Sequence, residues 1–256
     1  MEYRVLAVGD VVGEPGLRHL ERHLRPLQKL KNIAFTVVNG ENASGVGLTE
    51  EQAWRIRDAG ANAVTLGNHA FGKTQIAACL DETSWLLRPA NLSGRAPGHG
   101  CEIFDLGGVR IRVLNLIGRC DLSWGADNPF TAADRNLERG EAELTLVDFH
   151  AEATSEKLAL CAYLDGRVTA VVGTHTHVQT ADEAVSPVGT ATITDLGMTG
   201  PVDSILGMGK QQVLERFLTG IPVRLQPGSG EVELCGALVE TDERGRAQSI
   251  ERIRLR

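Results

Sequence analysis

Two histidines separated by a single residue, His175 and His177, carry the most distinctive chemistry in this sequence. They follow a short apolar run, 170–172, which predicts a buried strand that ends at Gly173. Past such a strand end both imidazoles could turn toward one point, and neutral imidazole is the commonest metal ligand in proteins. By itself the pair also fits a polar loop whose histidines hydrogen-bond to the backbone, so the rest of the sequence must decide.

Ligand-type side chains also follow four other predicted strands, at 4–8, 34–38, 63–66 and 144–147. The residues that come after these strands are Asp10, Glu41, Asn42, Asn68, His69 and His150. Taken singly, an aspartate fits a helix N-cap, an asparagine fits a turn, and a lone histidine fits a satisfied core position. A common site past the strand ends accounts for all of them at once.

This donor set consists of carboxylates, amides and imidazoles and contains no thiolate. It is too large for one tetrahedral ion and suits two ions that share a bridging carboxylate. Two metal ions roughly 3.5–4 Å apart form the usual clamp for phosphoryl-ester hydrolysis, because they polarise the phosphate oxygens and turn a bridging water into hydroxide. His69 is placed to be the general acid for the leaving oxygen. Imidazole and oxygen donors suit manganese, iron or zinc better than calcium or magnesium.

Composition limits the substrate class. The chain has 256 residues with a formal net charge of −7 and no cluster of lysine and arginine, which argues against binding to long nucleic acids. A small anionic substrate remains compatible, because a bound metal ion can supply local positive charge.

Composition also bears on the cellular compartment in which the protein is expected. The five cysteines are widely spaced without a C-x-x-C motif, which argues against a disulfide framework and against a thiolate zinc site. The apolar run at the N-terminus is too short for a signal peptide, and no run reaches the length of a transmembrane helix. We therefore expect a cytoplasmic protein with no membrane partner.

The first third of the chain alternates predicted strands with predicted helices. Leucines from Leu17 to Leu30 have helical spacing, and Pro26 should kink or end that helix. Thr49 and Gln52 indicate a capping box at the start of the next helix. This alternation implies a largely parallel sheet, whose functional site lies outside the carboxyl ends of its strands.

The rest of the chain predicts a second β-rich half. Gly107-Gly108 indicates a hairpin between strands at 101–106 and 109–116. Further strands are expected at 170–172, 190–194, 223–225, 232–240 and 249–255, and helices at 132–141, 154–164 and 211–218. The segments 121–129 and 197–201 are expected to be loops, of which the first could line or cover the site. With no repeat and no linker, we expect one domain over residues 1–256.

The candidate ligands also fall in a known order. Five blocks resemble the signatures of the calcineurin-type metallophosphoesterases, which run D-x-H, G-D, G-N-H, a single histidine and G-H-x-H. These blocks are Gly9-Asp10, Asn39-Gly40-Glu41-Asn42, Gly67-Asn68-His69, His150 and Gly173-Thr174-His175-Thr176-His177.

Two positions depart from the common pattern. Val12 stands where most members have a metal-binding histidine, and Glu41 stands where most have the bridging aspartate. Asn42 could supply the ligand that Val12 cannot. Both departures are regular features of the YmdB-like phosphodiesterase branch, which residues 9–13, 88–91, 148–157 and 195–201 resemble as well. The resemblance therefore covers essentially the whole chain.

The resemblance implies an α/β fold, a four-layer α/β/β/α sandwich with two facing mixed sheets. It also implies two divalent or trivalent metal ions per chain, with iron or manganese ahead of zinc. Two sets of three ligands would hold them, with Glu41 bridging and His69 as the proton donor. The first set is Asp10, Asn42 and His177, and the second is Asn68, His150 and His175. Asp148 and Glu152 could be outer partners of metal-bound imidazoles.

We therefore expect a dimetal phosphodiesterase whose nucleophile is a metal-bridging hydroxide. The resemblance implies activity on phosphodiesters, notably 2′,3′-cyclic nucleotides, with 3′,5′-cyclic nucleotides as a further candidate. It also implies a bacterial, cytoplasmic protein, some of whose relatives act on gene expression and biofilm formation. Two alternatives stay open, a broad-specificity phosphatase or nuclease and a regulatory nucleotide-binding protein with slow turnover. The edge formed by the C-terminal strands could pair chains into a homo-oligomer.

Overall fold

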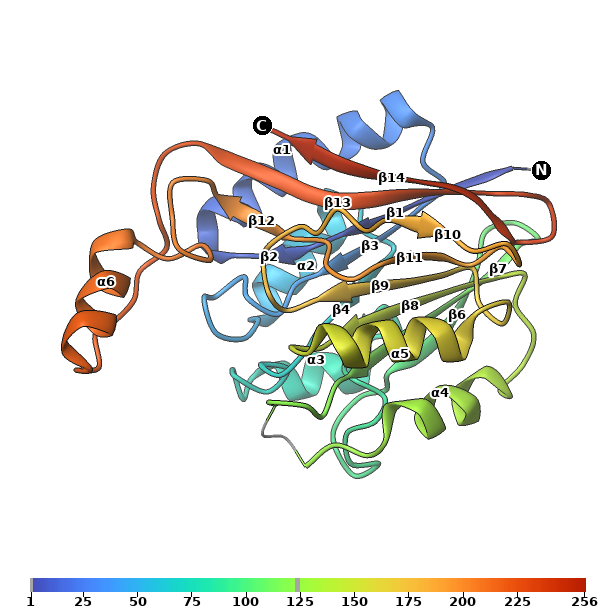
Figure 1. Ribbon diagram of the computed structural model, residues 1–256, viewed down its shortest axis with the longest axis horizontal. Coiled ribbons are helices and arrows are strands. Elements are labelled where there is room, and N and C mark those ends of the chain that lie inside the picture. The colour runs from blue at the N-terminus through green and yellow to red at the C-terminus, as the bar shows by residue number, and fades with distance from the viewer. Residues whose placement is uncertain (1, 123–124) are drawn as a thin grey trace.

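Two mixed β-sheets lie face to face between layers of helices (Figure 1). The computed structural model describes residues 2–122 and 125–256. The first sheet has eight strands. Seven of them form the path β2 (Asp10–Val11), β12 (Met198–Pro201), β13 (Val232–Thr241), β1 (Tyr3–Val8), β3 (Phe35–Asn39), β4 (Ala63–Thr65) and β5 (Leu86–Leu87). β14 (Ala247–Leu255) pairs with β13.

The second sheet has six strands. Their order is β10 (Ala184–Val185), β11 (Ala191–Ile193), β9 (Ala170–Thr174), β8 (Leu144–His150), β7 (Arg110–Ile117) and β6 (Cys101–Asp105). The four inner strands run parallel, whereas the edge strands β10 and β6 pair antiparallel. The predicted parallel run of the first third, β1-β3-β4-β5, and the predicted hairpin across Gly107-Gly108 are both confirmed.

Apolar clusters fill the spaces between the four layers. Along β1, Leu6 and Val8 face outward and pack with α1 (Gly13–Lys31), α2 (Glu50–Ala59) and α3 (Ile76–Glu82). Val5 faces the opposite way, into the cluster between the two sheets, because successive side chains of a strand alternate faces. A third cluster joins the second sheet to α4 (Pro129–Leu137) and α5 (Thr154–Leu164). This is the four-layer sandwich that the family resemblance implied.

Helix α1 extends at both ends beyond the leucines, Leu17 to Leu30, whose spacing predicted it. It starts at Gly13, with Pro15 in the first turn, where the missing N–H has no intrahelical partner to lose. It then continues through Pro26 to Lys31, so Pro26 does not end the helix, which was one of the two effects expected of it. Pro26 lies on the exposed face, while Leu24 and Leu27 bury the opposite face on either side of it.

Three other segments also differ from expectation. Residues 198–201 form strand β12 rather than a loop, because they pair with Asp10–Val11 and with β13. Residues 223–225 form no strand and connect α6 (Lys210–Thr219) to β13. Helix α4 starts at Pro129, before the predicted 132, because the Asn128 side chain caps it. Two positions of the predicted loop 121–129, namely 123 and 124, lie outside the described residues.

Helix α6 projects from the layered body at one end (Figure 1). Its exposed apolar residues include Phe217 and Leu218. Within residues 2–122 and 125–256, no helix combines the length and the apolar character needed to cross a membrane.

Candidate metal centre

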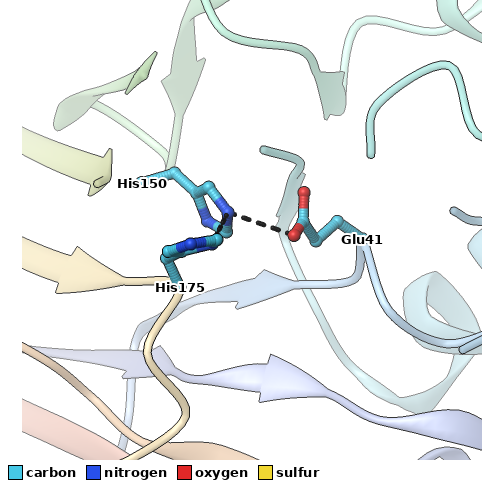
Figure 2. Close-up of side chains that lie close together, drawn as sticks. All are labelled: Glu41, His150 and His175. Atoms are coloured by element: carbon cyan, nitrogen blue, oxygen red, sulfur yellow. Dashed lines mark hydrogen bonds and ion pairs between the residues drawn. The ribbon is translucent and has the colours of Figure 1, made fainter. Parts of the chain in front are cut away.

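The ligand-type residues meet beyond the carboxyl ends of neighbouring strands. β1, β3 and β4 lead into Asp10, Glu41 and Asn68 respectively, while β8 and β9 of the facing sheet lead to His150 and His175. Because the register of β8 and β9 pairs His150 with Thr174, the two histidines emerge side by side. Figure 2 shows the side chains of Glu41, His150 and His175 turned toward one another from these three segments.

Glu41, His150 and His175 form the tightest group. Glu41 Oε1 lies 3.1 Å from His150 Nε2, which in turn lies 3.0 Å from His175 Nδ1. One ligand atom from each of the three residues lies within 4.8 Å of the others. Asn68 Oδ1 joins them at 2.8 Å from His150 Nε2. The cluster could therefore hold a metal ion.

Asp10, Asn42 and His177 form a second group beside the first. Asn42 Nδ2 lies 3.2 Å from His177 Nε2 and 3.4 Å from Asp10 Oδ1. It also lies 3.2 Å from Glu41 Oε1, so Glu41 contacts both groups. The Asp10 carboxylate also accepts a hydrogen bond from the backbone N–H of His175 at 3.2 Å. Every ligand predicted from the sequence thus lies in one connected cluster.

His69 lies at the rim of this cluster, with a third of its side chain exposed. Its Nδ1 lies 3.0 Å from Asn42 Oδ1 and 3.5 Å from Glu41 Oε1. Its backbone N–H donates to Glu41 Oε2 at 3.1 Å. The ring is therefore held through Nδ1.

Each of the three histidines proposed as metal ligands has an oxygen partner at the ring nitrogen that faces away from the cluster. His150 Nδ1 contacts Thr174 Oγ1 at 3.0 Å, His175 Nε2 contacts Glu152 Oε2 at 3.1 Å, and His177 Nδ1 contacts the Leu206 carbonyl at 3.1 Å. If each outer nitrogen donates its proton to that oxygen, the inner nitrogen of each ring presents a lone pair to the cluster. Metal-binding histidines are usually held in this way.

The acceptor atoms that converge on the centre of the cluster are suited to binding a cation. Around His150 Nε2 lie a carboxylate oxygen, an amide oxygen and a second imidazole nitrogen, none of which needs to donate a proton. Among the described residues, no salt bridge joins buried Asp10 or Glu41 to a lysine or arginine. Buried carboxylates require a compensating charge, which a metal ion or a protonated imidazole could supply. The donor set of oxygen and imidazole ligands therefore fits metal binding.

The pKa shifts within the cluster also show that its buried carboxylates are stabilised by neighbouring positive charge. Burial opposes charge on Glu41, but the imidazoles of His150 and His69 outweigh it and hold the pKa of this carboxyl well below its usual range. Burial likewise disfavours charged His150, yet Glu41 and Asp10 raise its pKa to about 9. Asp10 and His177 form a similar couple, with the pKa of the carboxyl lowered and that of the imidazole raised.

His150 is supported by a buried chain of hydrogen bonds. Thr174 Oγ1 donates to Asp148 Oδ1 at 2.8 Å, and Asp148 Oδ2 accepts from Thr65 Oγ1 at 2.5 Å and from Asn39 Nδ2 at 3.3 Å. Burial raises the pKa of Asp148 to about 6, although these hydrogen bonds oppose the shift. The chain links both sheets behind the cluster. Glu152 was expected to contact a candidate ligand and does so directly, whereas Asp148 reaches His150 only through Thr174.

The loop that carries His175 and His177 is held by a buried ion pair. Lys157 Nζ lies 2.8 Å from Asp195 Oδ2, and both side chains are almost fully buried. Asp195 also accepts from the backbone N–H and the hydroxyl of Thr176, at 3.1 and 2.8 Å. This clamp keeps His175 and His177 at positive φ, 106° and 65°, a region that such residues seldom occupy.

Gly67 is required by the close approach of two candidate ligands. A Cβ at this position would lie 2.3 Å from His150 Cδ2 and 2.4 Å from Glu41 Oε2. Glycine therefore lets the chain between β4 and Asn68 pass directly beneath the cluster.

No role was predicted from the sequence for the polar residues that end strands β3, β4 and β9. Asn39, Thr65 and Thr174 are all buried and all contact Asp148. In the sequence, each of them is a polar residue at the end of an otherwise apolar strand. Such a residue, when buried, needs a hydrogen-bond partner. The sequence pattern could not say which partner, because Thr65 and Asp148 lie 83 positions apart.

Comparisons with known proteins agree with this picture. The model of the family described as "YmdB-like protein" matches residues 6–253. A Bacillus subtilis (strain 168) relative named 2′,3′-cyclic-nucleotide 2′-phosphodiesterase is 45% identical over 254 residues, which cover 98% of this chain and 96% of the relative.

Solved structures resemble the whole chain as well. A structure described as a novel phosphatase, from Mycoplasma pneumoniae, superposes with a TM-score of 0.93 at 32% identity and covers 100% of this chain and 94% of its own. The NAD nucleotidase of Haemophilus influenzae has a TM-score of 0.62 at 13% identity, covering 99% of this chain and 56% of its own, and shows likeness of fold alone. The two-sheet architecture is thus that of nucleotidases with the metallophosphoesterase fold.

Proposed function

Because the chain belongs to the YmdB-like protein family, we propose that it hydrolyses small phosphodiesters at a centre of two metal ions, with 2′,3′-cyclic nucleotides as the main substrates. The chain is a hydrolase of phosphoric ester bonds, as are the relatives it matches by name. The substrate class rests on the name of the relative that is 45% identical over nearly the whole chain.

The observation that carries the proposal is the position of Glu41. Its Oε1 lies 3.1 Å from His150 Nε2 in one group and 3.2 Å from Asn42 Nδ2 in the other. A carboxylate that contacts both groups is what two neighbouring ions require as a bridge. We assign the remaining ligands in two sets, Asp10, Asn42 and His177 in one, and Asn68, His150 and His175 in the other.

The donor chemistry favours iron or manganese, with zinc as a further candidate. When bound, two such ions would polarise the phosphate oxygens and activate water for attack on phosphorus. The side-chain amide of Asn42 lies where Asp10, Glu41 and His177 converge, so rotating the amide by half a turn would add its oxygen to that set.

His69 is the residue we assign to protonation of the leaving group. Its Nδ1 is held by Asn42 and Glu41, and a third of its side chain is exposed at the rim of the cluster. A proton on Nε2 could pass to the leaving oxygen of a bound ester as the phosphorus–oxygen bond breaks. The name of the 2′-phosphodiesterase relative points to O2′ as that oxygen in a 2′,3′-cyclic nucleotide, which would make the 3′-monophosphate the product.

The proposal is tested by comparing substrates on one preparation. We would measure initial rates of manganese-loaded protein on 2′,3′-cyclic AMP, 3′,5′-cyclic AMP, p-nitrophenyl phosphate and a short single-stranded RNA. We expect the highest kcat/KM for 2′,3′-cyclic AMP and loss of turnover after chelation, restored by added manganese. A preference for the monoester would instead indicate a general phosphatase. Full turnover in the chelated sample would contradict the metal centre.

A further inference from the structure

A second cavity with cationic walls lies where α4 meets the segment that joins β5 to β6. Its volume is about 380 Å³, and its lining includes Arg88, His99, Cys101, Asp127, Arg135 and Arg139. None of its lining residues belongs to the candidate metal centre. The cavity is therefore a separate feature of the molecule.

Arg88 places a buried positive charge in this wall. Only 5% of the residue is exposed, and its guanidinium donates to the carbonyls of Pro89, Ala96 and Pro97. Among the described residues no carboxylate forms a salt bridge with it, and burial lowers its pKa against the weak influence of Asp81. A buried guanidinium held only by carbonyls lacks a counter-ion, which the cavity beside it could accommodate.

Two further arginines leave the cavity with an excess of positive charge. Arg135 has a distant ion partner, Asp127 at 3.7 Å, and Arg139 forms no salt bridge within the described part of the chain. His99 contacts Glu102 at 3.3 Å. Among the lining residues, three guanidinium groups accompany a single carboxylate, that of Asp127, although the chain as a whole has a net charge of −7.

We propose that this cavity is a second binding site, for a small anion that bears a phosphate group. Guanidinium groups match phosphate oxygens in geometry and charge, so Arg135 and Arg139 could bind such a group at the mouth while Arg88 supplies potential from below. The volume lies near the lower end of the range of small-molecule sites, about 300–1,000 Å³, which admits inorganic phosphate or a mononucleotide. This inference is independent of the proposed function.

The reactivity of Cys101 can report whether an anion occupies the cavity. It lines the cavity and is partly exposed, whereas Cys120 is exposed outside it. Burial raises the pKa of the Cys101 thiol to about 11, so its alkylation by iodoacetamide should be slow and easily timed at mildly alkaline pH. We would follow both cysteines by peptide mass spectrometry in metal-loaded protein, without anion and with inorganic phosphate or adenosine 5′-monophosphate.

We expect the anion to slow alkylation of Cys101 and to leave Cys120 unchanged. At a ligand concentration about ten times Kd, mass action gives roughly tenfold protection. Protection by inorganic phosphate shows that the phosphate group suffices, whereas protection by the nucleotide alone assigns the site to a phosphate monoester. Absence of protection with both anions would overturn the proposal.

Variants separate this site from the metal centre. Arg135→Gln combined with Arg139→Gln should abolish the protection, while Arg244→Gln, an exposed arginine outside the cavity, should retain it. Glu41→Gln, which alters the metal centre, should also retain it. Equal protection in the double variant, or its loss in Glu41→Gln, would refute the assignment to this cavity.

Discussion

His150 and Thr174 lie opposite each other in the register of neighbouring parallel strands, and the Thr174 hydroxyl lies 3.0 Å from His150 Nδ1. Because that hydroxyl donates its own proton to Asp148, it can only accept from the ring. The ring is thereby held with Nδ1 on Thr174 and with Nε2 facing Glu41 and Asn68. A strand pairing thus determines the orientation of a candidate metal ligand.

Replacing Thr174 by valine tests this orientation. Thr174→Val keeps the shape but removes the hydroxyl, so we expect a 10–100-fold loss of activity or metal affinity, the usual effect of losing an outer partner of a ligand. The buried Asp148 oxygen would also lose its donor, at a cost of about 1–3 kcal/mol in the free energy of unfolding. Thr174→Ser, which keeps the hydroxyl, should restore most of the activity, and equal losses in the two variants would contradict the account.

Glu41 should be the least replaceable carboxylate. Glu41→Gln removes the charge that contacts both ligand groups, so we expect bound metal to fall and turnover to drop by more than about 100-fold, the upper end for residues outside the ligand set. Metal content by plasma mass spectrometry and kcat would be measured together. The matched variant is Glu152→Gln, whose half-exposed carboxylate contacts His175 from the outer side and should have the smaller effect.

Gly67 offers a steric test of the same geometry. Gly67→Ala places a methyl group within 2.4 Å of both His150 and Glu41, so the ligands must move apart and activity should fall sharply. Gly94→Ala is the control, because a Cβ there meets no atom within 4 Å and the residue does not have positive φ. The two variants would be compared by kcat/KM and by thermal unfolding. Normal activity in Gly67→Ala would show that the cluster is looser than described.

The Lys157–Asp195 pair should stabilise the fold as well as the loop of His175 and His177. Lys157→Met leaves a buried aspartate without its cation, and such a loss typically costs about 3–5 kcal/mol. Arg18→Met, which breaks an exposed pair with Glu14 on α1, should cost less than about 1 kcal/mol. Urea unfolding would give both free energies, and similar values for the two variants would argue against a structural role for the buried pair.

Much of this arrangement could be predicted from the sequence, because its signals are local. The capping box of Thr49 and Gln52 and the hairpin at Gly107-Gly108 each depend on residues a few positions apart. The candidate ligands were found since each follows an apolar run. Glu41 and His150 lie more than 100 positions apart and follow strands of different sheets, so the sequence groups them only through their places at predicted strand ends and in the motif order of the metallophosphoesterases.

The features that could not be predicted depend on a partner elsewhere in the chain. Met198–Pro201 has the composition of a turn and becomes a strand only because Asp10–Val11 and β13 lie on either side. Helix α1 passes through Pro26 because the apolar face of the helix is already buried against the first sheet. Thr174 was visible as a polar residue, but its role depends on Asp148, which the strand register places beside it.

The most direct test of the central claim is a phosphorus NMR time course of manganese-loaded protein with 2′,3′-cyclic AMP, run beside His69→Ala. We predict conversion to the 3′-monophosphate by the wild type, and a far slower reaction by His69→Ala with its metal content unchanged. No conversion by wild-type protein that contains metal would contradict the proposed phosphodiesterase. Equal rates in the two proteins would contradict the assignment of His69 as the proton donor.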